Sequence, residues 1–117
     1  MGRKTNEFLD TETERAARIF LERLAGHYDV LGAVVFGSRA RRRHRPDSDA
    51  DIAILLRGER GSFLGTKLAL ADIAFDVLLD TGVLIQPLPV WEDEWEHPEA
   101  YSNPELLRNI HRDGVRL

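Results

Sequence analysis

The sequence predicts an α/β (α+β) protein in which helices pack on one small mixed β-sheet. Two short apolar runs have the composition of buried strands, an amphipathic helical pattern precedes them, and a long apolar helical pattern follows. The chain has 117 residues, of which 43% are hydrophobic, so it is long enough for one core and too short for two. We therefore expect a single domain over residues 1–117.

The first helix is expected to begin near Thr11, because Thr11 and Glu14 have the spacing of a capping box. Gly26 is expected to end it. Its apolar face is marked by Ala16, Ile19, Phe20 and Leu24.

Two buried strands are expected next, at Val30–Phe36 and Ala50–Leu56, because both runs are almost continuously apolar. Gly37-Ser38 closes the first strand, and an arginine-rich loop leads to the second. Asp49 and Asp51 interrupt the apolar pattern at the start of the second strand, which makes them candidates for a functional role.

A long helix is predicted from about Ser62 to Leu79, and Asp80-Thr81-Gly82 is expected to end it. The residues expected to face the core are Phe63, Leu64, Leu68, Ala71, Phe75 and Leu78. Asp72 and Asp76 are expected on the outer surface of this helix.

The remaining residues predict a third strand at Val83–Val90, placed at a sheet edge because Pro87 and Pro89 lack a backbone N–H. A short acidic turn or helix should follow at Trp91–Glu96, with one tryptophan in the core and its acids on a solvated face. Asn103-Pro104 is a typical helix opening; that helix should reach about Arg112 and precede a short strand at 115–117.

Composition excludes several classes of protein. The chain has no cysteine, which rules out disulfides and thiolate metal sites. The polar segment Met1–Asp10 lacks the apolar run of a signal peptide, and no stretch is long enough to span a bilayer. We expect a soluble, cytoplasmic protein without a membrane partner.

Charge is distributed unevenly along the chain. Residues 1–60 carry 12 Lys/Arg and 10 Asp/Glu, whereas residues 61–117 carry 4 and 10. The acidic half would repel nucleic-acid phosphates, so direct nucleic-acid binding is not expected. A local polyanion such as a triphosphate suits the arginine-rich segment 39–45 better, although such a run is equally often a solvated loop.

The strongest functional pattern is Gly37-Ser38 followed, after ten residues, by Asp49-Ala50-Asp51. Residues two apart in a strand point to the same side, so the two carboxylates should lie together and require a cation between them. Carboxylate oxygens without histidine or cysteine favour magnesium or manganese. The Gly-Ser corner can bring backbone N–H groups and a hydroxyl to a phosphate. The alternative is that Asp47 or Asp49 merely caps exposed amides in a turn.

The segments Val35–Ala40 and Asp47–Ala53 resemble the signature of the nucleotidyltransferase superfamily that includes DNA polymerase beta. The spacing and small size are similar to minimal nucleotidyltransferases, which often act as antitoxins beside a HEPN-domain ribonuclease toxin. The resemblance covers residues 35–56 closely, and the order of elements is compatible with the nucleotidyltransferase fold over nearly the whole chain.

This resemblance implies a function for each residue of the pattern. Gly37 and Ser38 would contact a nucleoside triphosphate, expected to be ATP, and Arg39 beside them would touch its phosphates. Asp49 and Asp51 would be the catalytic residues that bind Mg²⁺ or Mn²⁺. The reaction would transfer a nucleoside monophosphate, expected to be AMP, to a hydroxyl, which can be a tyrosine of the partner toxin.

The sequence departs from the family at one position. Active members usually carry a third carboxylate on the strand after the long helix, but Val83–Val90 contains no acid, and Gln86 is its nearest polar residue. An amide cannot act as a general base. Two functions therefore stay open: an active nucleotidyltransferase, and a binding module that neutralises a partner protein by contact. Modification of a small molecule is disfavoured because the chain has no room for an acceptor domain, and association into an oligomer is possible.

Overall fold

The computed structural model describes residues 8–117 as four helices, one 3₁₀ turn and a four-stranded sheet. Most of the segment Met1–Asp10, whose polar sequence disfavours a signal peptide, lies outside the described residues. In chain order the elements are α1 (Thr11–Leu24), β1 (Val30–Phe36), β2 (Ala50–Leu56), α2 (Phe63–Thr81), β3 (Ile85–Trp91), α3 (Glu92–Glu96), η1 (Pro98–Ala100), α4 (Pro104–Asp113) and β4 (Val115–Arg116).

The sheet has the strand order β3-β2-β1-β4 and is mixed, as the sequence predicts. β1 pairs antiparallel with β2 and with β4, whereas β2 and β3 are parallel and are connected through α2. β3 lies at the sheet edge, which confirms the position inferred from Pro87 and Pro89. A proline is tolerated there because only one side of the strand needs ladder hydrogen bonds.

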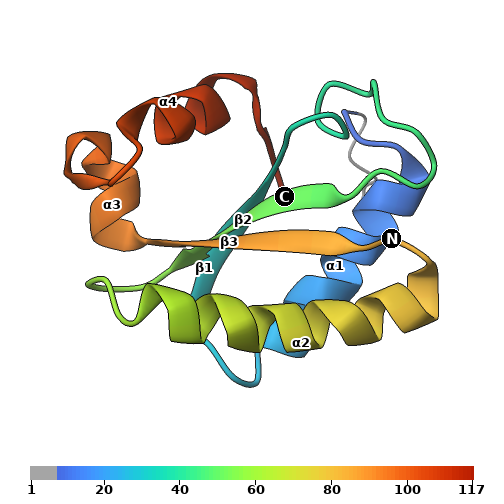
Figure 1. The fold of residues 1–117 in the computed structure, drawn as a ribbon, viewed down its shortest axis with the longest axis horizontal. Coiled ribbons are helices and arrows are strands. Elements are labelled where there is room, and N and C mark those ends of the chain that lie inside the picture. Colours follow the sequence, from blue (N-terminus) through green and yellow to red (C-terminus); the bar gives the residue numbers. More distant parts are fainter. Residues whose placement is uncertain (1–7) are drawn as a thin grey trace, which may run out of the picture.

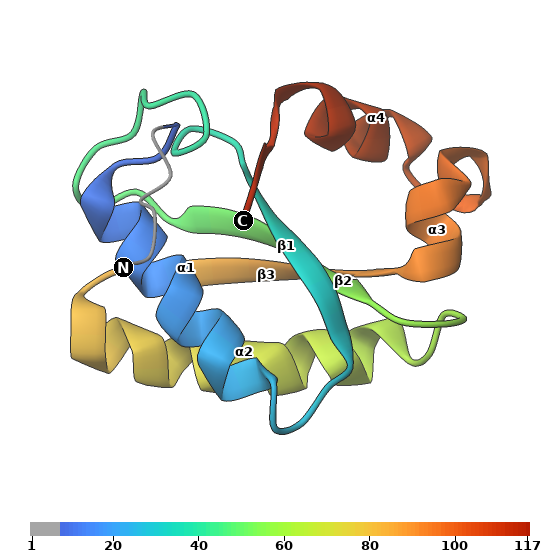
Figure 2. The same cartoon turned by 180° about the vertical axis from the view of Figure 1, so that it is seen from behind.

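Helices cover both faces of the sheet (Figures 1 and 2). α1 and α2 pack on one face, where Ile52 and Ile54 of β2 join the larger core cluster. On the other face, Ala53 and Leu55 of β2 pack in a smaller cluster with Tyr101 and with residues of α4. The loop from β1 to β2 and helix α3 lie at opposite ends of the sheet in both views. The face of the sheet that carries α4 is therefore covered mainly near α3, and the opposite end of the same face lies beside the β1–β2 loop.

Helix α1 begins at Thr11 as expected, but its cap is Asp10. The Asp10 carboxylate accepts hydrogen bonds from the backbone N–H of Thr13, at 3.1 Å, and from the Thr13 hydroxyl, at 2.6 Å. A carboxylate at this position also favours the positive end of the helix dipole. Of the apolar residues expected inside, Ala16, Phe20 and Leu24 are buried and Ile19 is half-buried. The helix ends at Leu24, two residues before Gly26.

Helix α2 has the expected length, but the prediction of its buried face is wrong. Ser62 caps the first turn, and Gly82 ends the helix in the left-handed conformation with φ +79°. The residues buried against the sheet are Leu70, Ala74 and Val77, whereas Leu64, Leu68 and Phe75 of the predicted stripe are exposed. α2 is apolar on more than one side, so the periodicity of its sequence does not determine which side packs on the sheet.

The C-terminal segment packs on the opposite face largely as predicted. The Asn103 side chain accepts from the backbone N–H of Leu106 at 3.3 Å, which confirms the expected cap of α4. Trp91 is buried, but so is Glu94, which was expected on a solvated face. Its carboxylate accepts from the Trp91 N–H at 3.1 Å and lies 3.3 Å from Arg60. These two partners offset the cost of burying the charge.

Candidate active site

The residues of the predicted site come together where three strands lie side by side. Gly37 and Ser38 follow β1 directly, Asp51 lies near the start of β2, and Gln86 lies near the start of β3. Strand pairing places Asp51 beside Phe36 on one side and beside Gln86 on the other. Asp51 alternates with Ala53 and therefore points to the face of the sheet that carries α4.

Gly37 allows the backbone to pass directly against the Asp51 carboxylate. Its φ is +74°, a left-handed conformation that side chains rarely adopt, and a Cβ built at this position would lie 2.5 Å from Asp51 Oδ2. The end of β1 and the acid on β2 are thus closer than any other residue type at position 37 would permit. A phosphate bound at the glycine corner would lie next to a metal ion held by Asp51.

A helix-like turn follows the glycine. The backbone N–H of Arg41 donates to the Gly37 carbonyl at 3.2 Å, and that of Arg43 donates to the Ser38 carbonyl at 2.9 Å. The first N–H groups of such a turn have no carbonyl partner within it. Together with the Ser38 hydroxyl, they form a set of donors suited to phosphate oxygens.

The two acids are in an electrostatically strained arrangement. Burial raises the pKa of the Asp51 carboxyl, the negative charge of Asp49 raises it further, and the positive charge of Arg41 partly opposes this. Among the residues that the structure describes, no side-chain or backbone donor reaches the Asp51 carboxylate. The Gln86 amide donates to Asp49 Oδ2 at 3.1 Å. A cation bound between the acids would relieve the repulsion.

Asp49 and Asp51 suit magnesium or manganese, but the third carboxylate that active members of the family usually carry is missing beside them. Asp49 and Asp51 supply hard carboxylate oxygens, as these ions prefer. The described residues contain no group of three or more His, Cys, Asp or Glu side chains that could hold a metal ion. Gln86, paired with Asp51 and bonded to Asp49, takes the place beside the two acids where a third carboxylate would complete such a group.

The alternative explanation of Asp49 as a turn cap finds no support in the loop itself. The hydroxyl that accepts a backbone N–H in this turn belongs to Ser48, which bonds Arg45 N at 2.9 Å. Within the described part of the chain, neither Asp47 nor Asp49 accepts a hydrogen bond from the backbone. The exposed Asp49 is therefore available to a ligand.

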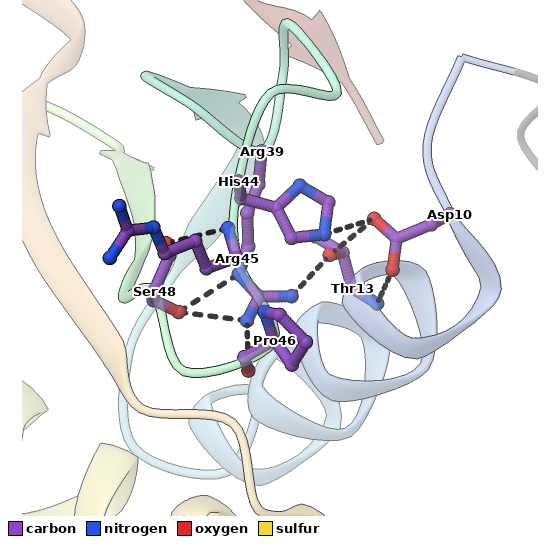
Figure 3. Close-up of polar contacts among 7 residues, drawn as sticks. All are labelled: Asp10, Thr13, Arg39, His44, Arg45, Pro46 and Ser48. Carbon is purple, nitrogen blue, oxygen red and sulfur yellow. Dashed lines mark hydrogen bonds and ion pairs between the residues drawn. The ribbon is translucent and has the colours of Figure 1, made fainter.

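Arg39 occupies a different position from the one expected of a phosphate ligand (Figure 3). Its side chain is 1% exposed, and its guanidinium donates to the Ser48 carbonyl at 2.7 and 3.1 Å, to the Pro46 carbonyl at 3.3 Å and to the Thr13 hydroxyl at 2.8 Å. The guanidinium thus ties the loop to the start of α1 and fixes Ser48, the neighbour of Asp49. Its planar set of donors serves several carbonyls at once, which a lysine could not do.

Arg41 is the arginine whose charge acts on Asp51. Its side chain is exposed, and its positive charge opposes the rise in the pKa of Asp51 that burial and Asp49 cause. The sequence offered no way to separate it from its neighbours, because five arginines occur between positions 39 and 45. Only the turn after Gly37 determines which of them points inward and which lies near Asp51.

Comparison with known proteins identifies the family. The sequence profile described as "Polymerase beta, Nucleotidyltransferase" matches residues 21–86, which is more than half of the chain and includes every residue of the candidate site. The chain belongs to the polymerase beta nucleotidyltransferase family. No curated protein sequence gives a significant match.

A solved structure supports the fold of this nucleotidyltransferase domain. A protein from Sulfolobus solfataricus, described as a candidate nucleotidyltransferase, is similar with a TM-score of 0.58 and 18% sequence identity. The similarity covers 98% of this chain and 90% of the other. At this identity the comparison concerns the fold, which is the nucleotidyltransferase fold over essentially the whole chain.

Proposed function

We propose that the protein binds a nucleoside triphosphate, ATP in the first instance, together with Mg²⁺ or Mn²⁺ and transfers the nucleoside monophosphate to a hydroxyl group. The observation that supports this most directly is the contact between Gly37 and Asp51, which joins a phosphate corner to a pair of acids. The raised pKa of Asp51, caused by burial and by the charge of Asp49, is the mark of a pair that needs a cation.

Each residue has a definable role in this reaction. Asp49 and Asp51 hold the metal, while Ser38 and the backbone after Gly37 orient the phosphates. Magnesium, when bound, neutralises charge on the triphosphate. The acceptor oxygen forms a bond to the α-phosphorus, the bond to pyrophosphate breaks, and the acceptor proton must pass to a base. Arg41, and not Arg39, supplies positive charge near the acids.

A second candidate function is supported by Gln86. Its amide bonds Asp49 in the place beside the two acids, and an amide cannot take the proton of the acceptor hydroxyl. The chain would then bind nucleotide and metal but transfer slowly or not at all, and it would act on a partner protein by contact.

For the biological setting we propose a cytoplasmic antitoxin that acts on a HEPN-domain partner protein. The spacing between Gly37-Ser38 and Asp49-Ala50-Asp51, which resembles that of minimal nucleotidyltransferases, supports this role. A tyrosine of the partner is the acceptor in this proposal.

The test is incubation with Mg²⁺ and labelled ATP, with and without the protein encoded by the neighbouring gene. The variant Asp49→Asn/Asp51→Asn removes both metal ligands, and Asp47→Asn/Asp93→Asn removes two exposed acids elsewhere as a control of equal charge. Transfer in the wild type and the control, lost in the first variant, supports the enzyme. Absence of transfer, with the partner still bound and inhibited by the first variant, leaves only the binding function.

Gln86→Asp separates the two candidates further. If the missing acid limits the reaction, this variant should gain about 10²–10⁴-fold in transfer rate. An unchanged rate in an otherwise active protein would mean that another group accepts the proton. Folding of the variant is checked by its circular dichroism, and its nucleotide affinity is measured alongside the rate.

A further inference from the structure

A chain of buried hydrogen bonds connects the first turn of α1 to the loop before β2 (Figure 3). Thr13 is fully buried, and its hydroxyl accepts a hydrogen bond from Arg39 Nη1 at 2.8 Å. Nε and Nη2 of the same guanidinium donate to backbone carbonyls of the loop. A side chain of α1 therefore takes part in holding the backbone that leads to the candidate acids.

This chain acts on Asp49 through one peptide group. Nε and Nη2 of Arg39 both donate to the Ser48 carbonyl, at 3.1 and 2.7 Å. That carbonyl belongs to the peptide group that joins Ser48 to Asp49, and a peptide group is planar. Its orientation therefore helps to set the position of the Asp49 Cα atom, which carries one of the two candidate metal ligands.

The Thr13 hydroxyl is oriented toward Arg39 by Asp10. A threonine hydroxyl has one proton to donate, and this one is donated to Asp10 Oδ1 at 2.6 Å. The lone pairs of the hydroxyl oxygen are left to face Arg39. The cap of α1 is a separate contact, in which Asp10 Oδ2 accepts from the backbone N–H of Thr13 at 3.1 Å. The hydroxyl is thus used for Arg39 and is not needed for the cap.

Arg39 depends on this hydroxyl for its orientation. Among the residues that the structure describes, Thr13 Oγ1 is the one acceptor for Arg39 Nη1. A buried donor without an acceptor is unfavourable, so loss of the hydroxyl favours a different orientation of the guanidinium. Because the guanidinium is a single plane, a turn of that plane also moves the two nitrogens that hold Ser48.

We propose that Thr13 is a positioning residue for the candidate metal site, because its hydroxyl holds Arg39 in the orientation that fixes the peptide between Ser48 and Asp49. The inference rests on the proposed function, in which Asp49 and Asp51 hold Mg²⁺ or Mn²⁺. Thr13 lies 26 residues before Arg39 and outside residues 21–86, which the family profile matches. The metal site thereby includes a contribution from α1 that the sequence signature does not contain.

Binding of Mn²⁺ alone to the purified chain, followed by electron paramagnetic resonance, tests the effect on the site. Thr13→Val keeps the shape of the side chain without its hydroxyl and should raise the dissociation constant for Mn²⁺ about tenfold, whereas Thr13→Ser should stay within about twofold of the wild type. Should Thr13→Val fail to fold, Thr13→Cys, with a weaker acceptor, replaces it. Wild-type affinity in the variant without the hydroxyl overturns the proposal.

Ser62→Ala is the control for a general loss of stability. It removes another hydroxyl from the start of a helix, the one that caps α2 at the end nearer to α3 (Figure 1). This variant should bind Mn²⁺ as the wild type does. A rise in its dissociation constant equal to that of Thr13→Val would attribute both effects to stability and overturn the proposal.

A double variant tests whether Thr13 acts through Arg39. Arg39→Lys keeps the charge but cannot serve Thr13 and Ser48 at once, so adding Thr13→Val to it should weaken Mn²⁺ binding no further. Equal effects of Thr13→Val in both backgrounds would show that Thr13 acts by another route.

A measurement without metal separates this inference from the proposed function. The Arg45 and Ser48 amides close the turn before Asp49, with hydrogen bonds of 2.9 and 3.0 Å. Thr13→Val should speed their hydrogen exchange about tenfold, and Ser62→Ala should not. A wild type that binds no Mn²⁺ contradicts the proposed function, and the exchange rates then decide the role of Thr13. Unchanged exchange in Thr13→Val overturns the positioning role whether or not metal binds.

Discussion

Arg39 lies in the loop between β1 and β2, Asp51 lies just after that loop in β2, and their surroundings differ sharply. The Arg39 guanidinium is fully buried and forms four hydrogen bonds to Ser48, Pro46 and Thr13. The Asp51 carboxylate is half-buried, lies near a second acid, and receives no hydrogen bond from the described residues.

The comparison distinguishes a residue that stabilises the fold from one that is a candidate for binding a ligand. A buried guanidinium whose three nitrogens all have acceptors within the protein stabilises the fold and is not accessible to a ligand. A carboxylate held near another acid without a donor destabilises the folded protein until a cation binds. Arg39 therefore positions Asp49 through Ser48, whereas a cation bound beside Asp51 would relieve its repulsion from Asp49.

The largest effect is expected when Arg39 is removed. Arg39→Met leaves the carbonyls of Pro46 and Ser48 without their charged donor, which should lower the free energy of unfolding by about 3 kcal/mol. Arg41→Met, a matched change at an exposed arginine of the same loop, should cost no more than about 0.5 kcal/mol. Urea denaturation followed by circular dichroism measures both.

The same pair of variants distinguishes the two roles considered for Arg39. If Arg39 were a phosphate ligand, Arg39→Met would lose ATP affinity and keep its stability. The structure leads to the opposite expectation for stability. If the protein binds ATP as proposed, Arg41→Met is the variant expected to lose affinity directly. Equal stability of the two variants would contradict the assignment of Arg39 to the fold.

A smaller effect is expected at Gly37. Gly37→Ala and Gly58→Ala both place a side chain at a positive φ, +74° and +91°, which should cost about 1–2 kcal/mol in each case. Only at Gly37 does the new Cβ meet a neighbour, the Asp51 carboxylate. Isothermal titration with Mg²⁺–ATP should therefore show a loss of affinity for Gly37→Ala and none for Gly58→Ala. Equal affinities would show that the close approach is not needed for binding.

The elements could be predicted because their signals are local. The bounds of β1 and β2 follow from uninterrupted apolar runs, and the cap of α4 follows from Asn103-Pro104. The candidate acids could be singled out for a similar reason, since Gly37, Ser38, Asp49 and Asp51 lie close in sequence and the alternation of a strand relates the acids to each other.

What the sequence did not determine depends on contacts between distant segments. Packing against the sheet determines which side of α2 is buried, because both sides of the helix are apolar. The position of Arg39 depends on Thr13, 26 residues away, and on the path of the loop. The contact between Gln86 and Asp49 depends on the register between β2 and β3, and no local sequence pattern encodes this register.

The smallest effect concerns the pH dependence of stability at Asp51. Burial and the charge of Asp49 raise its pKa in the folded state above the ordinary value of 3.8, so the folded state binds this proton more tightly than the unfolded state does. Stability should therefore fall as the pH rises from 3.8 through the raised pKa, and ionised Asp51 should destabilise the protein at neutral pH. Because the group is half-exposed and partly screened, the cost is a few tenths of a kcal/mol.

Asp51→Asn should accordingly raise Tm slightly at pH 7 without metal, and the gain over the wild type should shrink as the pH is lowered toward 3.8. Adding Mg²⁺–ATP should reverse the order, because a ligand that binds only the folded wild type raises its Tm and cannot raise that of the variant. Asp47→Asn, an exposed acid of the same loop, should follow the wild type in both conditions. A variant less stable than the wild type without metal would mean that Asp51 is satisfied within the protein, as Arg39 is, and the contrast between the two charges would disappear.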